Sequence, residues 1–289
     1  MKKIDIRGSA FAVGQALGAF GREAWHAKLT QTALWQTVTA MKDAEQTRSM
    51  RSLVQSAYPL IWQELEGLAE GLDAPFDELF AWNCRGDLVR STSDGCTTVA
   101  GSTAEGELII AHNEDGFPQL RNDCAIVSIT PDDGLAFTSF AYPGSICGHT
   151  FAVNEEGVVN TVNNIRALHR PDGMPRQILA RAALNATTLD EAISILTTGP
   201  RAGAFHHTLG QRGDGRLFSV EATGTGCSVT PLRDVFAHAN HLIHPQLDAV
   251  EQVITDSSRS RQQRLNAWLD TQSHLDGTAA LGILSDQHD

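Results

Sequence analysis

The sequence is short of basic residues: lysine and arginine together number 22, against 34 aspartates and glutamates, and the formal net charge is -12. Nucleic acids and anionic membranes select for basic faces, so neither is an expected partner. The sequence has no apolar stretch long enough to span a bilayer, and no apolar run follows the lysines near its N-terminus, as a secretory signal requires. We therefore expect a cytoplasmic protein.

Several signatures of common enzyme classes are missing as well. There is no Walker A loop, no Gly-x-Gly-x-x-Gly after a predicted strand, no Gly-x-Ser-x-Gly elbow and no CxxC pair, which argues against the usual nucleotide, hydrolase-triad and redox functions. Five cysteines are present without close pairing, namely Cys84, Cys96, Cys124, Cys147 and Cys227. An odd, unpaired set favours reduced thiols over a disulfide framework.

The order of the predicted elements indicates one layered domain. Apolar residues at helical spacing predict that the first ninety or so residues are mostly helical, with helices near 13–24, 34–41, 50–57 and 61–72. Strands are predicted at 108–110, 125–130, 135–142, 151–153 and 158–162, two helices at 175–186 and 192–196, strands at 205–211, 217–222, 227–230 and 235–239, and a helix at 257–269. This order is typical of an α+β domain with antiparallel sheets.

Cys96 is the candidate nucleophile. A thiol is the natural nucleophile closest to being useful at neutral pH. Gly95 directly before it leaves the Gly95 carbonyl open to attack by the side chain of its own neighbour. Cleavage of the Gly95–Cys96 bond would free an α-amino group with a pKa of about 7.7 to 8.0, which can act as the base for the thiol. The alternative is a buried, inert thiol.

Asp94–Thr98, at the start of a predicted strand, resembles the self-processing site of the acyl-coenzyme A:6-aminopenicillanate acyltransferase family, whose N-terminal-nucleophile members include carcinine and β-alanyl-dopamine hydrolases. Glu64–Gly71 and Asn83–Asp87 resemble patterns of that family's propeptide segment. The resemblance implies a four-layer αββα sandwich of the N-terminal-nucleophile hydrolase type. It also implies a zymogen that becomes an α/β heterodimer, with residues 1–95 as the helical propeptide segment and 96–289 as the catalytic segment of one structural domain. A turn cap with a surface ion pair is the alternative for Asn83–Asp87.

The same resemblance assigns further catalytic residues. Asp115, in Asn113-Glu114-Asp115, would orient the amine or thiol of Cys96. Asn240 matches the asparagine that lines the family's oxyanion hole, and a backbone N–H at Asn163 or Asn164 would join it, with register favouring Asn164. Arg261 takes the functional position of a Ser-x-x-Arg-x-x-Arg element and could favour the thiolate or pair with Asp115.

Two of these assignments have ordinary structural alternatives. Asn113 and Asp115 could simply cap a turn before Gly116. Arg261 opens a strongly basic helix, for which a solvated face is the commoner explanation.

The predicted substrate-binding residues are Thr98, Asn113 and Glu114. No cofactor or metal is expected. The segments Tyr142–Gly144 and Gly148–Asn154 look closer to the β-alanyl-amine hydrolase branch than to the penicillin branch. Glu114 could then face a substrate ammonium, although glutamates are usually just solvated. Members of the family usually continue with at least one more strand after the position at which this chain stops, so we expect either a shortened version of the fold or a truncated sequence.

Two rival functions come from other classes. His206, His207 and the His-x-x-His-x-x-His run at 238–244 could belong to a metal-dependent hydrolase, but a spacing of three suits neither a strand nor the usual helical ligand pair. A non-catalytic relative could keep the fold as a binding module. The favoured hypothesis is a self-processing cysteine amidohydrolase or acyltransferase that acts on a small N-acyl amide through a thioester, with possible further oligomerisation.

Overall fold

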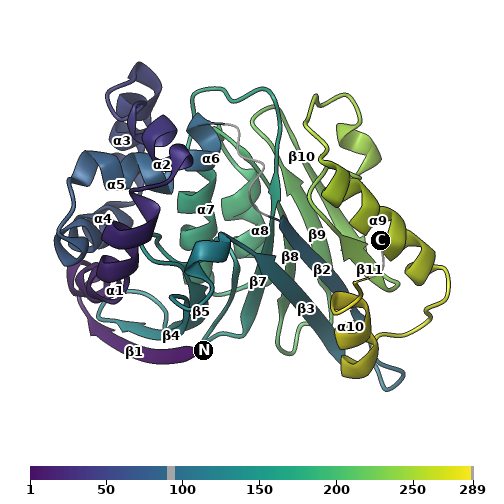
Figure 1. The fold of residues 1–289 in the computed structure, drawn as a ribbon. Coiled ribbons are helices and arrows are strands. Elements are labelled where there is room, and N and C mark those ends of the chain that lie inside the picture. The colour runs from purple at the N-terminus through teal and green to yellow at the C-terminus, as the bar shows by residue number, and fades with distance from the viewer. Residues whose placement is uncertain (90–94, 288–289) are drawn as a thin grey trace.

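The computed structural model describes residues 1–89 and 95–287, whose strands form two sheets (Figure 1). The larger sheet has the order β1-β4-β5-β6-β7-β8-β9-β10 and the smaller one the order β11-β2-β3. The strands of the larger sheet are β1 (Lys2–Gly8), β4 (Ala125–Pro131), β5 (Phe137–Ala141), β6 (Phe151–Asn154), β7 (Val158–Ile165), β8 (Ala204–Gln211), β9 (Leu217–Ala222) and β10 (Cys227–Leu232). Those of the smaller sheet are β2 (Gly95–Ser102), β3 (Leu108–Asp115) and β11 (Phe236–His238).

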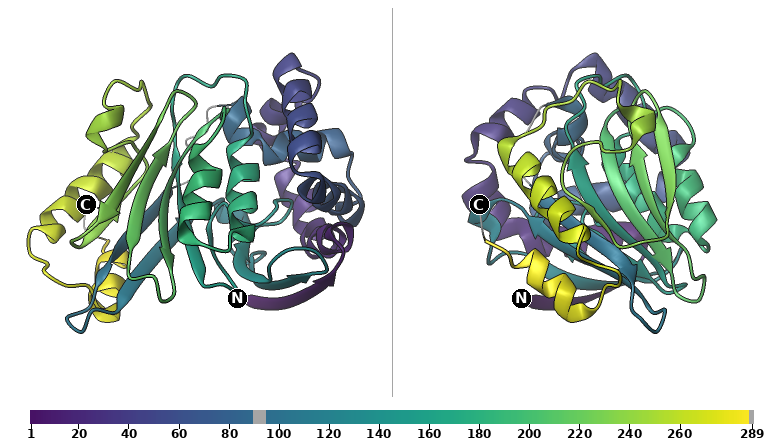
Figure 2. Two further views of the ribbon diagram at one scale, coloured as in Figure 1. Left: turned by 180° about the vertical axis from the view of Figure 1, so that it is seen from behind. Right: turned by 90° about the vertical axis from the view of Figure 1, so that its right-hand side faces the viewer.

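The two sheets lie between helices and make four layers (Figure 2). Helices α7 (Arg176–Ala182) and α8 (Leu189–Thr197) cover the outer face of the larger sheet, where α8 contacts β8 and β9. Strand β2 packs on β7 between the sheets, and α9 (Asp256–Leu269) and α10 (Gly277–Leu284) cover the outer face of the smaller sheet. The predicted four-layer αββα sandwich is therefore confirmed, and its sheets are antiparallel except where β1 pairs parallel with β4.

The N-terminal helices gather at the β1 and β4 end of the larger sheet (Figure 1). They are α1 (Ala10–Ala24), α2 (Ala33–Thr39), α3 (Glu45–Ala57), α4 (Pro59–Leu72), α5 (Phe76–Asn83) and α6 (Arg85–Leu88). Helices α1 and α4 touch through glycines, because a Cβ atom on Gly14 would lie 1.9 Å from the Glu64 carbonyl oxygen and one on Gly67 1.9 Å from that of Phe11. This close approach explains why glycine recurs inside two otherwise regular helical patterns.

One hydrophobic core joins the parts of the chain before and after Cys96. Trp25 and Trp82 from the N-terminal helices lie in the same buried cluster as Ile129 and Ile146. A buried ion pair also crosses this boundary, with Arg181 Nε 2.9 Å from Glu64 Oε2. The N-terminal segment is therefore part of the folded core and not an appendage.

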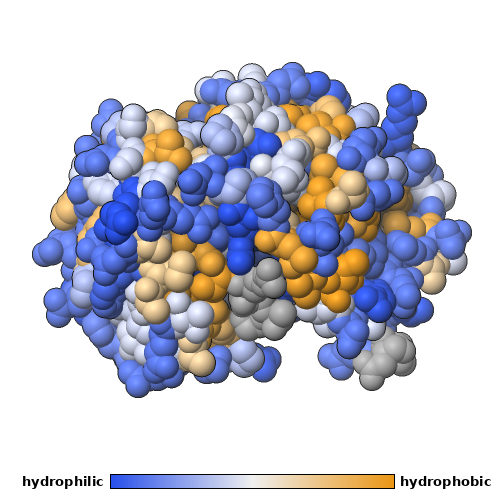
Figure 3. Space-filling view, turned by 90° about the horizontal axis from the view of Figure 1, so that it is seen from above, coloured by the Kyte–Doolittle hydropathy of each residue, from blue (hydrophilic) through white to orange (hydrophobic). Residues whose placement is uncertain are grey.

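The face of the molecule that is seen from above is largely polar. Seen from above, hydrophilic residues cover much of the face and apolar side chains gather in several patches (Figure 3). Within the two described ranges, no helix combines the length and the apolar character needed to cross a bilayer. All five cysteines are free, and only Cys227 is more than slightly exposed.

Candidate active site

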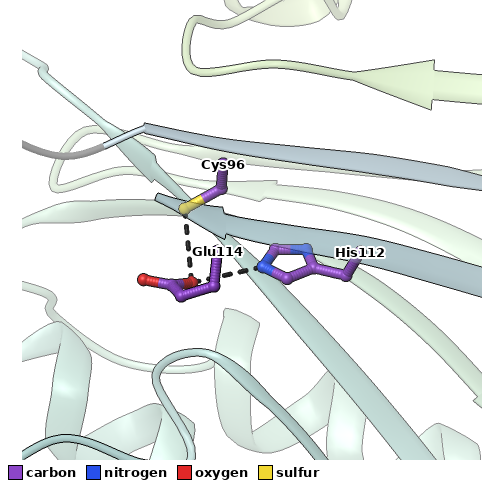
Figure 4. A group of neighbouring side chains, drawn as sticks. All are labelled: Cys96, His112 and Glu114. Carbon is purple, nitrogen blue, oxygen red and sulfur yellow. Dashed lines mark hydrogen bonds and ion pairs between the residues drawn. The ribbon is translucent and has the colours of Figure 1, made fainter. Parts of the chain in front are cut away.

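Strands β2 and β3 bring Cys96 beside two polar side chains. Cys96 pairs with Glu114 and Thr98 pairs with His112, and because strand residues alternate between faces, all four side chains lie on one face. The Cys96 thiol donates a hydrogen bond to Glu114 Oε2 at 3.5 Å, and that oxygen lies 3.2 Å from His112 Nε2 (Figure 4). Cys96 is 4% exposed.

The backbone of Cys96 is held by a side-chain amide and a guanidinium. The Cys96 N–H donates to Asn240 Oδ1 at 2.8 Å, and Arg261 Nη2 donates to the same oxygen at 2.7 Å. Two donors facing one atom identify it as the oxygen of the amide. Arg261 Nη1 also donates to the Cys96 carbonyl oxygen and, at 2.9 Å, to Thr97 Oγ1.

Helix α9 supplies Arg261 and holds Asn240 in place. Ser258 Oγ accepts from the Asn240 N–H at 2.9 Å and thereby ties the residues after β11 to the helix. Arg261 lies one turn further along and is half-buried, whereas Arg259 and Arg264 are exposed. Burial, opposed by the negative charge of Asp115, lowers the pKa of Arg261, which still remains charged at neutral pH. A solvated face therefore describes its two neighbours and not Arg261.

Asn164 and Asp115 also lie near the start of β2. The Asn164 carbonyl accepts from Asn240 Nδ2 at 3.1 Å, and the Asn164 side chain accepts from Arg176 at 2.6 Å. Asp115 pairs with Gly95 across the sheet, and its Oδ2 lies 3.6 Å from where a Cβ atom on Gly95 would be. Asp115 is thus next to the predicted cleavage site, on the face of β3 opposite to Glu114.

Two predicted substrate-binding residues are not positioned for that role. Asn113 lies on the face of β3 turned away from the Cys96 sulfur, and its amide donates to the Leu284 carbonyl at 2.5 Å. Thr98 is on the correct face but fully buried, with His112 Nδ1 at 2.7 Å and Asn163 Oδ1 at 2.8 Å from its hydroxyl. Of the three predicted contacts, only Glu114 lines the cavity at Cys96.

That cavity has an empty volume of about 760 Å³, part of which is open to solvent. Both segments of the chain contribute to its wall, and its apolar side chains include Leu34, Trp82, Phe117, Leu120, Val162 and Phe205. Its polar side chains are Asn83, Arg85, Asp87, Glu114, Tyr142, Ser145, His149, Asn164, Arg176 and Gln177. The site is therefore shaped for a partly apolar ligand with polar groups at fixed points.

Three cavity residues have protonation states determined by burial. Burial and the Glu114 charge raise the pKa of Tyr142, which stays protonated and donates to Glu114 Oε1 at 3.1 Å. Burial and the Arg85 charge lower the pKa of His149 to about 3, so His149 is neutral. Burial raises the pKa of Asp87 to about 6. Asp87 is 1% exposed, so the surface ion pair considered for this motif is wrong.

A buried polar network that the sequence did not predict continues from Glu114. It passes through His112 and Thr98 to Asn163, whose Oδ1 lies 3.1 Å from His206 Nδ1. The sequence could have indicated His112, because a residue two positions before Glu114 on the same strand lies on the same face of the sheet. Asn163 and His206 are distant in sequence from that strand, and no local pattern links them to it.

The His-x-x-His-x-x-His run belongs to the same buried region. His238 stacks on His206 with ring centroids 3.5 Å apart and bonds Glu221 at 3.0 Å. The ring of His241 bonds Ser258, and the ring of His244 bonds Ser219 and Ser228. All three rings are engaged in hydrogen bonds, and His238 and His244 both approach the Glu221 carboxylate.

Comparison with known proteins finds a family model and two relatives that agree with one another. Residues 102–289 match the family model described as acyl-coenzyme A:6-aminopenicillanic acid acyl-transferase. A Drosophila melanogaster protein named beta-alanyl-dopamine/carcinine hydrolase is 24% identical over 96% of this chain and 82% of its own length. An Emericella nidulans protein named acyl-coenzyme A:6-aminopenicillanic-acid-acyltransferase 40 kDa form is 26% identical over 80% of this chain and 65% of its own length. The resemblance drawn from the motifs is confirmed.

Proposed function

The chain belongs to the acyl-coenzyme A:6-aminopenicillanic acid acyltransferase family, and on that premise we propose that it is a self-processing cysteine amidohydrolase or acyltransferase. Its substrate is a small N-acyl amide, which is attacked by Cys96. The observation that carries this proposal is the position of Cys96: its sulfur lines the cavity while Asn240 and Arg261 hold its backbone. A nucleophile needs this combination of access and fixed orientation.

Self-processing begins with attack of Cys96 Sγ on the Gly95 carbonyl carbon. The peptide nitrogen leaves with a proton as the α-amine of Cys96, and water then hydrolyses the resulting thioester to free the Gly95 carboxylate. Glycine suits this position, since a Cβ atom on Gly95 would lie 3.0 Å from Arg261 Nη2, which is tighter than most contacts. The shared core supports an α/β heterodimer that stays assembled after the cut.

In the mature site, the α-amine takes the Cys96 thiol proton as the sulfur attacks the substrate carbonyl. The Asn240 amide carries two N–H donors, and one of them goes to the Asn164 carbonyl. Its second N–H, together with the backbone N–H of Asn164, stabilises the oxyanion. Asn240 Oδ1 and Asp115 orient the amine. The α-ammonium gives the thiol proton to the leaving amine, which departs, and water or another amine then takes the acyl group from sulfur and restores the Cys96 thiol.

The polar wall supports an acyl group that carries hydrogen-bond donors. Glu114 lies beside the sulfur, and Asp87 Oδ2 and His149 Nε2 are buried acceptors without a hydrogen-bond partner in the described residues. A substrate ammonium would satisfy such atoms, which favours a β-alanyl-amine-like substrate. Arg85 and Arg176 in the same wall favour a carboxylate-bearing, penicillin-like substrate as the second candidate.

A substrate screen tests the proposal. Purified protein is incubated with β-alanyl amines, penicillins and N-acyl amino acids beside a Cys96→Ala control. We expect turnover of at least one class, with β-alanyl amines preferred, and its loss in the variant. Turnover unchanged by Cys96→Ala would end the mechanism. A single uncut chain that is inert to all three classes and to thiol-directed acylating reagents would support the alternative of a non-catalytic binding protein.

A further inference from the structure

The side chains around the nucleophile form a potential set of metal ligands. Within residues 1–89 and 95–287, the structure contains one group of three side chains whose ligand atoms all lie within 4.8 Å of one another: Cys96, His112 and Glu114 (Figure 4). They supply a sulfur, an imidazole nitrogen and a carboxylate oxygen. These are the three ligand types that zinc uses in proteins.

The spacing of these atoms suits a tetrahedral ion. With bonds of about 2.3 Å to sulfur, about 2.0 Å to nitrogen and about 2.1 Å to oxygen, tetrahedral zinc holds its ligand atoms roughly 3.3 to 3.6 Å apart. In the structure Cys96 Sγ lies 3.5 Å from Glu114 Oε2, and that oxygen lies 3.2 Å from His112 Nε2. Small side-chain adjustments would therefore admit the ion.

Outer hydrogen bonds orient two of the ligands. Thr98 donates to Asn163 Oδ1, so its hydroxyl oxygen accepts from His112 Nδ1–H at 2.7 Å. This bond leaves His112 Nε2 as the atom that faces the sulfur and the carboxylate. Tyr142 donates to Glu114 Oε1 at 3.1 Å, which leaves Oε2 for the ion. Such second partners are typical of histidine and carboxylate ligands in metal sites.

We propose that Cys96, His112 and Glu114 form a zinc site that reversibly blocks the nucleophile. The ion gains bonds to Cys96 Sγ, His112 Nε2 and Glu114 Oε2. Zinc takes the place of any proton on these three ligand atoms, those protons pass to solvent, and no electrons are transferred. The thiolate and carboxylate balance the charge of Zn²⁺, and water takes the fourth position, as in zinc sites with three protein ligands.

The ion acts here as an inhibitor and not as a cofactor. A thiolate bound to zinc is a weaker nucleophile than a free one, and the ion also obstructs approach of the carbonyl, so bound zinc slows turnover and chelation restores it. This consequence rests on the proposed function, whereas binding of zinc does not. Binding and turnover are therefore measured separately, so that failure of one proposal can be distinguished from failure of the other.

The experiment uses the purified full chain. Zinc per chain is measured by equilibrium dialysis, and the cobalt-substituted protein is examined for the ultraviolet thiolate-to-cobalt charge-transfer band. Cys96→Ser and His112→Gln each remove one ligand, and circular dichroism verifies that both variants are folded. Cys227→Ser is the matched control, because Cys227 is a half-exposed thiol on β10.

We expect one zinc per chain in the wild type and in Cys227→Ser, and at least about tenfold weaker binding in each folded ligand variant. The cobalt band should be present in the wild type and absent from Cys96→Ser. The proposal is overturned if the wild type binds no stoichiometric zinc, or if zinc binds Cys96→Ser and His112→Gln as tightly as the wild type. Zinc binding without substrate turnover would instead contradict the proposed function.

Discussion

Asn240 has two separable tasks in the proposed mechanism, and two substitutions distinguish them. Its Oδ1 accepts from the Cys96 N–H and from Arg261, while its Nδ2 donates to the Asn164 carbonyl and, in the mechanism, to the oxyanion. Asn240→Asp keeps an acceptor oxygen for Cys96 and Arg261 but removes the donor. Asn240→Ala removes both groups.

The expected losses follow from these contacts. We expect the same Asn240 donor to serve the oxyanion that forms on the Gly95 carbonyl during self-processing. Removing one oxyanion donor costs about 10² to 10³ in rate, so both variants should self-process at least about a hundredfold more slowly. Asn240 is fully buried, and the alanine variant removes the hydrogen bonds that its side chain makes with the Cys96 N–H and the Asn164 carbonyl. At roughly 1 to 3 kcal/mol for each of the two buried groups that lose this bond, Asn240→Ala should lower the free energy of unfolding by about 2 to 6 kcal/mol.

Self-processing is followed by gel electrophoresis of freshly translated chain, which requires no knowledge of the substrate, and stability is measured by urea denaturation. Asn240→Asp should be equally slow but lose less stability than Asn240→Ala: its carboxylate still accepts from the Cys96 N–H and pairs with Arg261, although it loses the bond to the Asn164 carbonyl. Processing of Asn240→Asp within a few-fold of the wild-type rate would refute the assigned donor role, whatever its stability.

Three further predictions concern packing, pH and specificity. Gly67→Ala should lower the free energy of unfolding by about 2 kcal/mol or more in urea denaturation, because the new Cβ atom would lie 1.9 Å from the Phe11 carbonyl oxygen. The control is Gly282→Ala in α10, where the added atom meets open space; this variant should be neutral or stabilising by up to about 1 kcal/mol. Folding raises the pKa of Asp87 to about 6 from an unfolded value of about 3.9. The stability that this carboxyl contributes is therefore present below about pH 4 and is lost as the pH rises through 6. In unfolding experiments over that pH range, the free energy of unfolding of Asp87→Asn should rise relative to that of the wild type by up to about 3 kcal/mol. Glu114→Gln should raise the KM of amine-bearing acyl substrates at least about tenfold and change that of uncharged analogues much less, as steady-state kinetics would reveal.

Each of these three predictions has a result that would contradict it. Equal destabilisation by Gly67→Ala and Gly282→Ala would show that the contact between α1 and α4 is not the cause. A difference between Asp87→Asn and the wild type that does not change from pH 4 to 7 would contradict the assigned burial of that carboxyl. Equal effects of Glu114→Gln on charged and uncharged substrates would contradict the ammonium contact.

Much of the fold was predictable because hydrophobic periodicity survives wherever one face of an element is buried. The helix predicted at 61–72 is α4 (Pro59–Leu72), and its internal glycines are explained by α1. Strand β1 was missed because Lys2–Gly8 alternates apolar and charged residues over only a short span, without a turn signal. Helix α5 was missed because Leu79 to Asn83 are buried all round, which erases the periodic contrast.

The sequence predicted only those site residues that belong to the family motifs. They identified Cys96, Asn240 and Arg261, which the structure brings into hydrogen-bond contact. They did not reveal which way strand residues face, so Asn113 was expected at the substrate although β3 turns it toward α10. His112 was overlooked, and its importance depends on the register between β2 and β3, which no local pattern specifies.

The most direct test of the central claim is mass spectrometry of the protein quenched in acid during reaction with an N-acyl amide substrate. We predict a fragment that begins with Cys96 and carries the acyl group as a thioester, which hydroxylamine removes. A chain that remains joined at Gly95–Cys96, or an acyl group attached to any residue other than Cys96, would contradict the account.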